Sequence, residues 1–152
     1  MSELAVVGNP EARAQIVSLQ GAMQLAIENG DLPSAECPVK HYFAPNLYIR
    51  EIFIPAGTAV VGKIHKHAHF NDISLGRVRV STEFGFDYLE APCRFTSLAG
   101  TKRAVYAETD VIWTTYHPTQ ETDIEKIEAE IIAKDYDELS LLSYTDIKGH
   151  IA

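Results

Sequence analysis

The stretch from about residue 39 to residue 118 constrains the fold of this chain more than any other feature of the sequence. It is rich in Val, Ile, Thr, Tyr and Phe, and Gly or Pro interrupts it at short, regular intervals. β-Branched and aromatic residues favour strands, Gly and Pro mark turns, and the spaces between them are too short for a helix of about 12 residues. Many short strands of this kind predict an antiparallel barrel or sandwich. We expect strands near residues 40–44, 47–54, 58–66, 68–75, 77–83, 86–90, 93–97, 103–107 and 110–117.

One helix is predicted on each side of this segment. Asn9-Pro10-Glu11 supplies an N-cap, a proline at the first helical position and an acid in the first turn, so a helix is expected at about 10–29. Thr122-Asp123-Ile124-Glu125 has the pattern of a capping box with Thr122 as the cap, and it predicts a second helix at about 122–134. The tail, 135–152, is apolar in places without a clear period. The whole chain, 1–152, is interpreted as a single domain.

Composition excludes several classes of function. The chain of 152 residues has a formal charge of −8, which argues against general binding to nucleic acid or to anionic membranes. It has no apolar run of about 20 residues and no signal-peptide pattern at the N-terminus. Its two cysteines, Cys37 and Cys93, form no CxxC pair. These features favour a reducing compartment, and a cytoplasmic location is expected.

Histidines are the first candidates for chemistry. His65, His67 and His69 alternate along predicted strands, and because side chains alternate between the two faces of a strand, all three are expected on one face. Three imidazoles can bind a divalent metal such as Zn, Fe, Ni or Mn. The alternative is a polar barrel interior in which the rings bond one another and water. His117, at the end of the last strand, is expected at the surface, with a smaller chance of joining a ligand site.

Two motifs in the β-rich segment resemble those of the cupin superfamily. The first contains a glycine, a His-x-His pair and a later glycine, and the second contains a Pro-x-Gly turn followed by a histidine. The matching stretches are Pro55-Ala56-Gly57, His65-Lys66-His67, Gly76, and Leu98-Ala99-Gly100-Thr101-Lys102-Arg103. The resemblance implies a cupin-like antiparallel β-barrel (jelly roll), flanked here by one N-terminal and one C-terminal helix, with a metal site inside.

The chain departs from the cupin pattern at two of the positions that bind the metal in that family. His69 stands where the family has a glutamate, and Arg103 stands where the family has its last metal-binding histidine. An arginine repels a cation and suits an anion such as a carboxylate or phosphate. Arg103 is therefore a candidate ligand-binding residue, and an ion pair with an acid of the chain is the alternative. Arg50 is expected on an exposed edge strand.

The chain as a whole is similar to short cupin-like proteins carried by phages and prophages. This resemblance implies a setting in the cytoplasm of the host cell or in the virion, with phage structural proteins as possible partners. Three functions remain open from the sequence. The first is a binding protein that holds a divalent metal or a small anionic ligand in the barrel. The second is a structural or assembly protein, and the third is a metal-dependent enzyme. A two-fold homo-oligomer is also expected, because the end helices and tail carry apolar surface.

Overall fold

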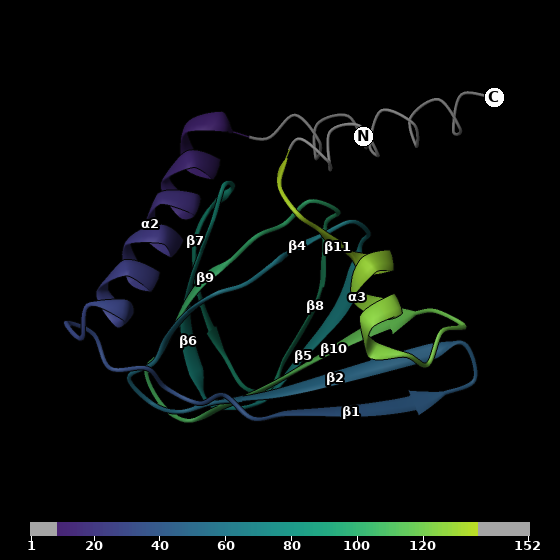
Figure 1. Ribbon diagram of the computed structural model, residues 1–152. Helices are drawn as coiled ribbons and strands as arrows, with labels where there is room; N and C mark the ends of the chain where they lie inside the picture. Colours follow the sequence, from purple (N-terminus) through teal and green to yellow (C-terminus); the bar gives the residue numbers. More distant parts are fainter. Residues whose placement is uncertain (1–8, 137–152) are drawn as a thin grey trace.

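The computed structural model describes residues 9–136 and has two helices and eleven strands in that range (Figure 1). The long helix α2 comes first and the short helix α3 follows the last long strand. The helices are α2 (Pro10–Glu28) and α3 (Ile124–Ile131). The strands are β1 (Val39–Ala44), β2 (Leu47–Ile54), β3 (Ala59–Val61), β4 (Ile64–His65), β5 (His69–Leu75), β6 (Arg77–Thr82), β7 (Gly85–Glu90), β8 (Cys93–Ser97), β9 (Ala104–Ala107), β10 (Val111–Pro118) and β11 (Ile132–Ala133).

The strands form a barrel-like arrangement of antiparallel sheets. A five-stranded sheet has the order β1-β2-β10-β5-β8, and a four-stranded sheet has the order β3-β9-β6-β7. A small sheet of β11 and β4 lies at one end of the barrel (Figure 1). The predicted mainly β jelly roll with one helix on each side is confirmed. No described helix has the length and apolar character that crossing a membrane requires.

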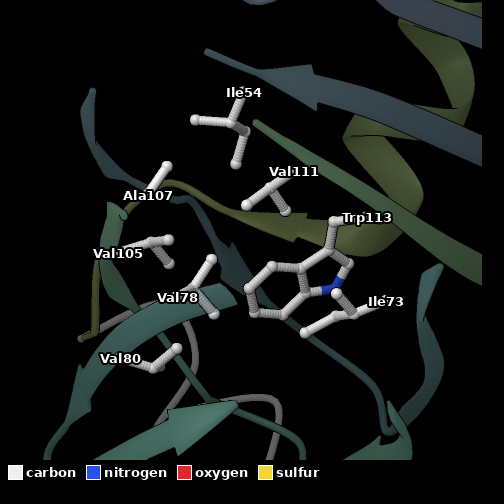
Figure 2. Close-up of a cluster of buried hydrophobic side chains, with 8 residues drawn as sticks. All are labelled: Ile54, Ile73, Val78, Val80, Val105, Ala107, Val111 and Trp113. Atoms are coloured by element: carbon white, nitrogen blue, oxygen red, sulfur yellow. The ribbon is translucent and has the colours of Figure 1, made fainter. Parts of the chain in front are cut away.

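The core lies between the two large sheets (Figure 2). Alternate residues of each strand point inward, so Val78 and Val80 of β6 face Ile73 of β5 and Trp113 of β10. Ile73 and Val78 have no exposed surface. The core fills the middle of the barrel with apolar side chains and leaves the polar residues at its ends. The buried members of this cluster are Ile54, Ile73, Val78, Val80, Val105, Ala107, Val111 and Trp113.

The predicted strand at 58–66 is wrong in one respect, because it is two strands. β3 pairs with β9 in the four-stranded sheet, whereas β4 leaves that sheet and pairs with β11. Gly62 and Lys63 separate the two strands. Gly62 N still donates to Arg103 O at 2.8 Å, so the chain turns away from the sheet immediately after this bond.

The predicted helix at 122–134 is shorter than expected. It ends at Ile131 because Ile132 and Ala133 adopt an extended conformation and pair with His65 and Ile64. The N-cap is Asp123, whose side chain accepts a hydrogen bond from Glu125 N, and the prediction of Thr122 as the cap is wrong. The tail predicted at 135–152 lies outside the described residues beyond residue 136.

Candidate functional site

Three histidine rings meet at one end of the barrel. His65 ends β4, His69 begins β5, and His117 lies near the end of β10. The ring centroids of His65 and His69 are 4.2 Å apart, those of His69 and His117 are 4.9 Å apart, and those of His65 and His117 are 5.5 Å apart. Because β5 and β10 are antiparallel neighbours, the start of one strand adjoins the end of the other. We call this trio the histidine cluster.

His117 is a correction to the sequence analysis, which expected it at the surface. Its side chain points into the molecule and is 3% exposed. Its direct partner on β2 is Tyr48, also 3% exposed, and the two rings stack with centroids 5.9 Å apart. Tyr48 Oη in turn lies 2.6 Å from Nδ1 of the exposed His41 on β1. A column of rings therefore runs from the surface of β1 to the histidine cluster.

His67 does not share a strand face with His65 and His69, contrary to the prediction. It lies in a bend at residues 66–67 between β4 and β5, and its side chain is exposed. Its carbonyl oxygen is 3.4 Å from His69 Nδ1. The bend breaks the alternation that the prediction assumed. His67 nevertheless lines a small cavity of about 80 Å³ together with His65 and His117, and Ile131 of α3 forms part of the wall.

The environment keeps the cluster uncharged at neutral pH. Burial, followed by the charges that His69 and His117 would carry, lowers the pKa of His65 from 6.5 to about 2. Burial likewise lowers the pKa of His69 to about 4 and that of His117 to about 4. Three neutral imidazoles can donate and accept hydrogen bonds or offer lone pairs to a ligand.

Arg103 lies on the inner side of this cluster. Its Cζ atom is 5.3 Å from the ring centroid of Phe95 and 5.8 Å from that of Trp113. Within residues 9–136, the Arg103 side chain forms no ion pair or hydrogen bond with a carboxylate. Burial lowers its pKa to about 10. The expected alternative, a close ion pair with an acid, is therefore not formed by the described residues.

Arg50 is the second cation at this end, and sequence reasoning missed it. It was expected on an exposed edge, but β2 is an inner strand, bonded to β1 and β10. Arg50 shares its face of β2 with Tyr48 and Ile54, which are buried. Its charge lowers the pKa of both His65 and His117, whereas the charge of Arg103 lowers the pKa of His65 and His69. The histidine cluster therefore lies within the field of two guanidinium groups.

The fit of a metal ion can be tested against these residues. Neutral imidazole nitrogens suit Zn, Fe, Ni or Mn. Across residues 9–136, however, no group of three or more His, Cys, Asp or Glu side chains is arranged to hold a metal ion. The rings of His65 and His117 are stacked with 5° between their planes, and the two arginines repel a cation. As arranged here, the cluster does not fit a metal, and its electrostatics suit an anion better.

A buried polar network lies one step deeper than the cluster. Asn71 Nδ2 donates to Ser97 Oγ at 2.7 Å, and Trp113 Nε1 donates to Asn71 Oδ1 at 3.0 Å. These side chains join β5, β8 and β10 and separate the polar end of the barrel from its apolar middle. Sequence analysis missed Asn71, although the strand alternation that selected His69 also selects Asn71. Asp72 faces the other way, with its Oδ2 3.7 Å from Arg94 Nε, as expected from the same alternation.

Comparisons with known proteins were made on sequence and on structure. No protein-family model matches the chain, and no curated protein matches it. A salicylate 1,2-dioxygenase from Pseudaminobacter salicylatoxidans superimposes with a TM-score of 0.55 at 15% identity, over 84% of this chain and 36% of that chain. The same dioxygenase in a structure with gentisate gives a TM-score of 0.51 at 17% identity, over 71% of this chain and 32% of that chain. A cupin domain from Bordetella pertussis gives 0.47 at 12% identity, over 58% and 98%.

The chain shares the β-barrel fold of the salicylate 1,2-dioxygenase structures. At these identities the likeness shows the fold alone, and the matched region spans only about a third of the dioxygenase chain. In this chain, the residues gathered at the polar end of the barrel are His65, His69, His117, Arg50 and Arg103. The resemblance to phage-encoded proteins stays a prediction.

Proposed function

We propose that this cupin-like protein is a binding module that holds a small anionic ligand at the histidine end of the barrel. The observation that supports the proposal is the pair of cations, Arg50 and Arg103, whose charges both act on His65. Neither forms an ion pair with a carboxylate among the described residues, although the charge of Asp87 also acts on Arg103. Both arginines are half-buried, and an anion that accepts hydrogen bonds from a partly desolvated cation offsets the cost of that desolvation. The imidazoles supply further donors around the same centre.

The ligand is small. The cavity lined by His65, His67 and His117 is about 80 Å³, which holds only a few water-sized groups. Neither arginine lines this cavity. A monocarboxylate, a short dicarboxylate or inorganic phosphate is small enough for the space, and its charge would be attracted by the two arginines that act on the cluster. Of the two cations, Arg103 is the more constrained, because its guanidinium lies over Phe95 and Trp113. A planar, stacked guanidinium is pre-organised for a forked bond to an oxyanion.

The test is a titration of acetate, malonate and inorganic phosphate, followed by calorimetry and thermal melts. At a hundredfold excess over Kd, a ligand adds about 2.7 kcal/mol of stability, which raises the Tm by about 5 °C or more. Arg103→Met keeps the apolar stem and removes the charge-assisted bonds, so affinity should fall at least about tenfold. Arg94→Met is the matched control, because Arg94 is on the outer side of β8 with a 70% exposed side chain. Equal affinities in both variants would reject Arg103 as the ligand residue.

A divalent metal held by His65, His67 and His69 is the alternative that the sequence predicted. The neutral imidazole nitrogens favour it, whereas the arrangement of the described rings does not. Elemental analysis of protein purified without chelator tests it directly. Arg103→His sharpens the test, because it replaces a repelling cation with a nitrogen donor and should tighten metal binding while abolishing anion binding. If neither metal affinity nor stability changes, the position has no role in a metal site.

Assembly is the third candidate, supported by apolar surface on the four-stranded sheet. Phe86 is 60% exposed and Tyr88 is 57% exposed on its outer face. Aromatic side chains in such a position are typical of protein interfaces. We propose a homo-oligomer on this basis, and light scattering at micromolar concentration tests it. A monomeric mass would contradict this proposal without affecting the ligand site.

A further inference from the structure

The histidine cavity is closed on one side by a separate piece of the chain. Ile131 of α3 lines the cavity, and Ile127 and Ile131 form a buried cluster with Tyr48. Figure 1 shows α3 lying against the end of the barrel at which β4 and β11 pair. A ligand that reaches the cluster from this side has to pass the segment formed by α3 and β11, residues 124–133.

Exposed residues, His67, Ala68 and Pro118, form part of the cavity lining. The buried rings of the cluster, His69 and His117, lie on strands that cannot yield locally. His117 is on β10, which is bonded to β2 on one side and to β5 on the other. His69 is on β5, which lies between β10 and β8. Opening either strand breaks two ladders of hydrogen bonds. The lowest-cost opening therefore involves the element with the fewest ties to the sheets.

The segment 124–133 is tied to the barrel by a short series of contacts. Its β-pairing is two residues long, His65 with Ile132 and Ile64 with Ala133. Lys66 N donates to Ile131 O at 2.8 Å, and Lys66 Nζ donates to Ala129 O at 2.9 Å. Thr119 Oγ1 donates to Glu130 Oε2 at 2.9 Å. Lys63 Nζ lies 3.8 Å from Glu128 Oε2, and apolar contacts join the segment to Tyr48 and Ile64.

We propose that α3 and β11 act as a lid that controls access to the histidine cluster, opening by release of β11 from β4. The proposal rests on the proposed ligand site, since it describes how that site is reached. The ends of the lid support this motion. Pro118 ends β10 before the lid begins, and the strand pairing between the lid and the barrel is only two residues long. Closure by Ile127 and Ile131 would exclude water from a bound anion and strengthen its bonds to the guanidinium groups.

A disulfide between the lid and β4 tests this motion. Ile64 and Ala133 are direct partners, and opposed residues in antiparallel pairs have Cα atoms about 4.5–5.5 Å apart, a distance that a disulfide spans. The variant Ile64→Cys/Ala133→Cys should therefore lock the lid when oxidised and release it when reduced. Ser81→Cys/Phe86→Cys, at opposed positions of β6 and β7, is the matched control in the four-stranded sheet. Peptide mass mapping verifies that Cys37 and Cys93 stay reduced.

The readout is the rate at which diethyl pyrocarbonate modifies each histidine, measured by mass spectrometry at neutral pH. This reagent reacts with neutral imidazole, which is the form that His65, His69 and His117 hold. We expect modification of His69 and His117 to be about tenfold slower in the oxidised lid variant than in the reduced one, because both are buried while the lid is closed. His41, exposed on β1, should react equally in both and serves as the internal reference. The control disulfide should leave all rates unchanged.

A second variant changes the lid in the opposite direction. Lys66→Met keeps the apolar stem and removes the bond from Nζ to Ala129 O, so the cluster should react faster than in the wild type. Equal rates for oxidised and reduced lid variants, with no increase in Lys66→Met, would overturn the lid. Because the reagent needs no anion, this result is independent of the ligand titration. If the disulfide slows modification of the histidine cluster but no anion binds, the lid proposal stands and the proposed ligand is rejected.

Discussion

The two helices of this protein show that the length of a helix and its attachment to the barrel are separate properties. Helix α2 has 19 residues, yet its one buried side chain is Ile16, and Leu25 is 57% exposed. Helix α3 has 8 residues and buries both Ile127 and Ile131. The long helix leaves a groove of about 870 Å³ beside β3, whereas the short helix closes the histidine cavity.

The difference lies in how each helix is held. The first turns of α2 are held by polar contacts, since Glu83 Oε2 accepts from Arg13 Nε at 2.7 Å and from Asn9 N at 2.8 Å. Its second half contacts little of the barrel. Helix α3 is held along its whole length by isoleucines spaced to face Tyr48. A regular apolar pattern therefore predicts a helix, but the partner surface decides whether the pattern is buried.

The largest expected effect comes from Glu83→Ala. The Glu83 side chain is 2% exposed and that of Arg13 is 11% exposed, so the variant removes one member of a buried ion pair and should cost about 3–5 kcal/mol. Urea denaturation measures the loss. Glu108→Ala is the matched control. Glu108 accepts from the Nε atoms of Arg77 and Arg79, but on the outer face of the sheet, so its effect should be smaller. Equal losses would contradict the anchoring of α2 at its start.

Ile127→Ala should have the next largest effect. Ile127 has no exposed surface, and truncating a fully buried isoleucine costs about 2–5 kcal/mol. The loss should be accompanied by faster modification of the histidine cluster, because the lid packs less well. A loss below about 1 kcal/mol would show that α3 contributes little to the core.

Acid should destabilise the protein through the histidine cluster. The three pKa values are depressed in the folded state to between about 2 and 4, whereas the unfolded rings titrate near 6.5. Protons therefore bind the unfolded state first, and stability present above pH 6.5 is lost as the pH falls toward 4, by up to about 1.4 kcal/mol per pH unit for each histidine. Measured unfolding free energies should fall less steeply in His117→Phe. His41→Phe, outside the cluster, should keep the wild-type slope.

The smallest effect is expected for Leu25→Ala on the exposed side of α2. A substitution at a 57% exposed position away from any anchoring contact should change the unfolding free energy by less than about 0.5 kcal/mol. Measuring the unfolding free energies of Leu25→Ala and Ile127→Ala together compares the two helices directly. A loss as large as that of Ile127→Ala would mean that a further chain covers the groove beside α2.

Much of this fold was predictable because the local signals agree with one another. The turn residues bound β1, β2 and β8 within a residue of the predicted ends, since Gly and Pro act on the backbone where they occur. The errors arise where a distant partner decides the outcome. Ile132 and Ala133 continue a helical pattern in the sequence, but they adopt an extended conformation because they pair with β4. The residues around 132 do not indicate this partner, which is distant in the sequence.

The candidate site was predicted in part for the same reason. His65 and His69 came from a local pattern, whereas His117 and Arg50 join them only through the order of strands in the five-stranded sheet. Alternation along β2 would have placed Arg50 on the face of Tyr48 and Ile54 if the strand had been recognised as an inner one. The alternation predicted the wrong face for His67 because the chain bends at residues 66–67. No glycine or proline stands there to indicate the bend in the sequence.

The indole of Trp113 is an intrinsic fluorescent probe of this end of the barrel. It is the one tryptophan of the chain, and it has Arg103 Cζ 5.8 Å from its ring centroid and its N–H bonded to Asn71. A fixed positive charge beside an indole shifts its emission, and an anion that neutralises the guanidinium reverses that shift. Occupancy can therefore be followed in the unlabelled protein by intrinsic fluorescence, with Arg103→Met as the blank.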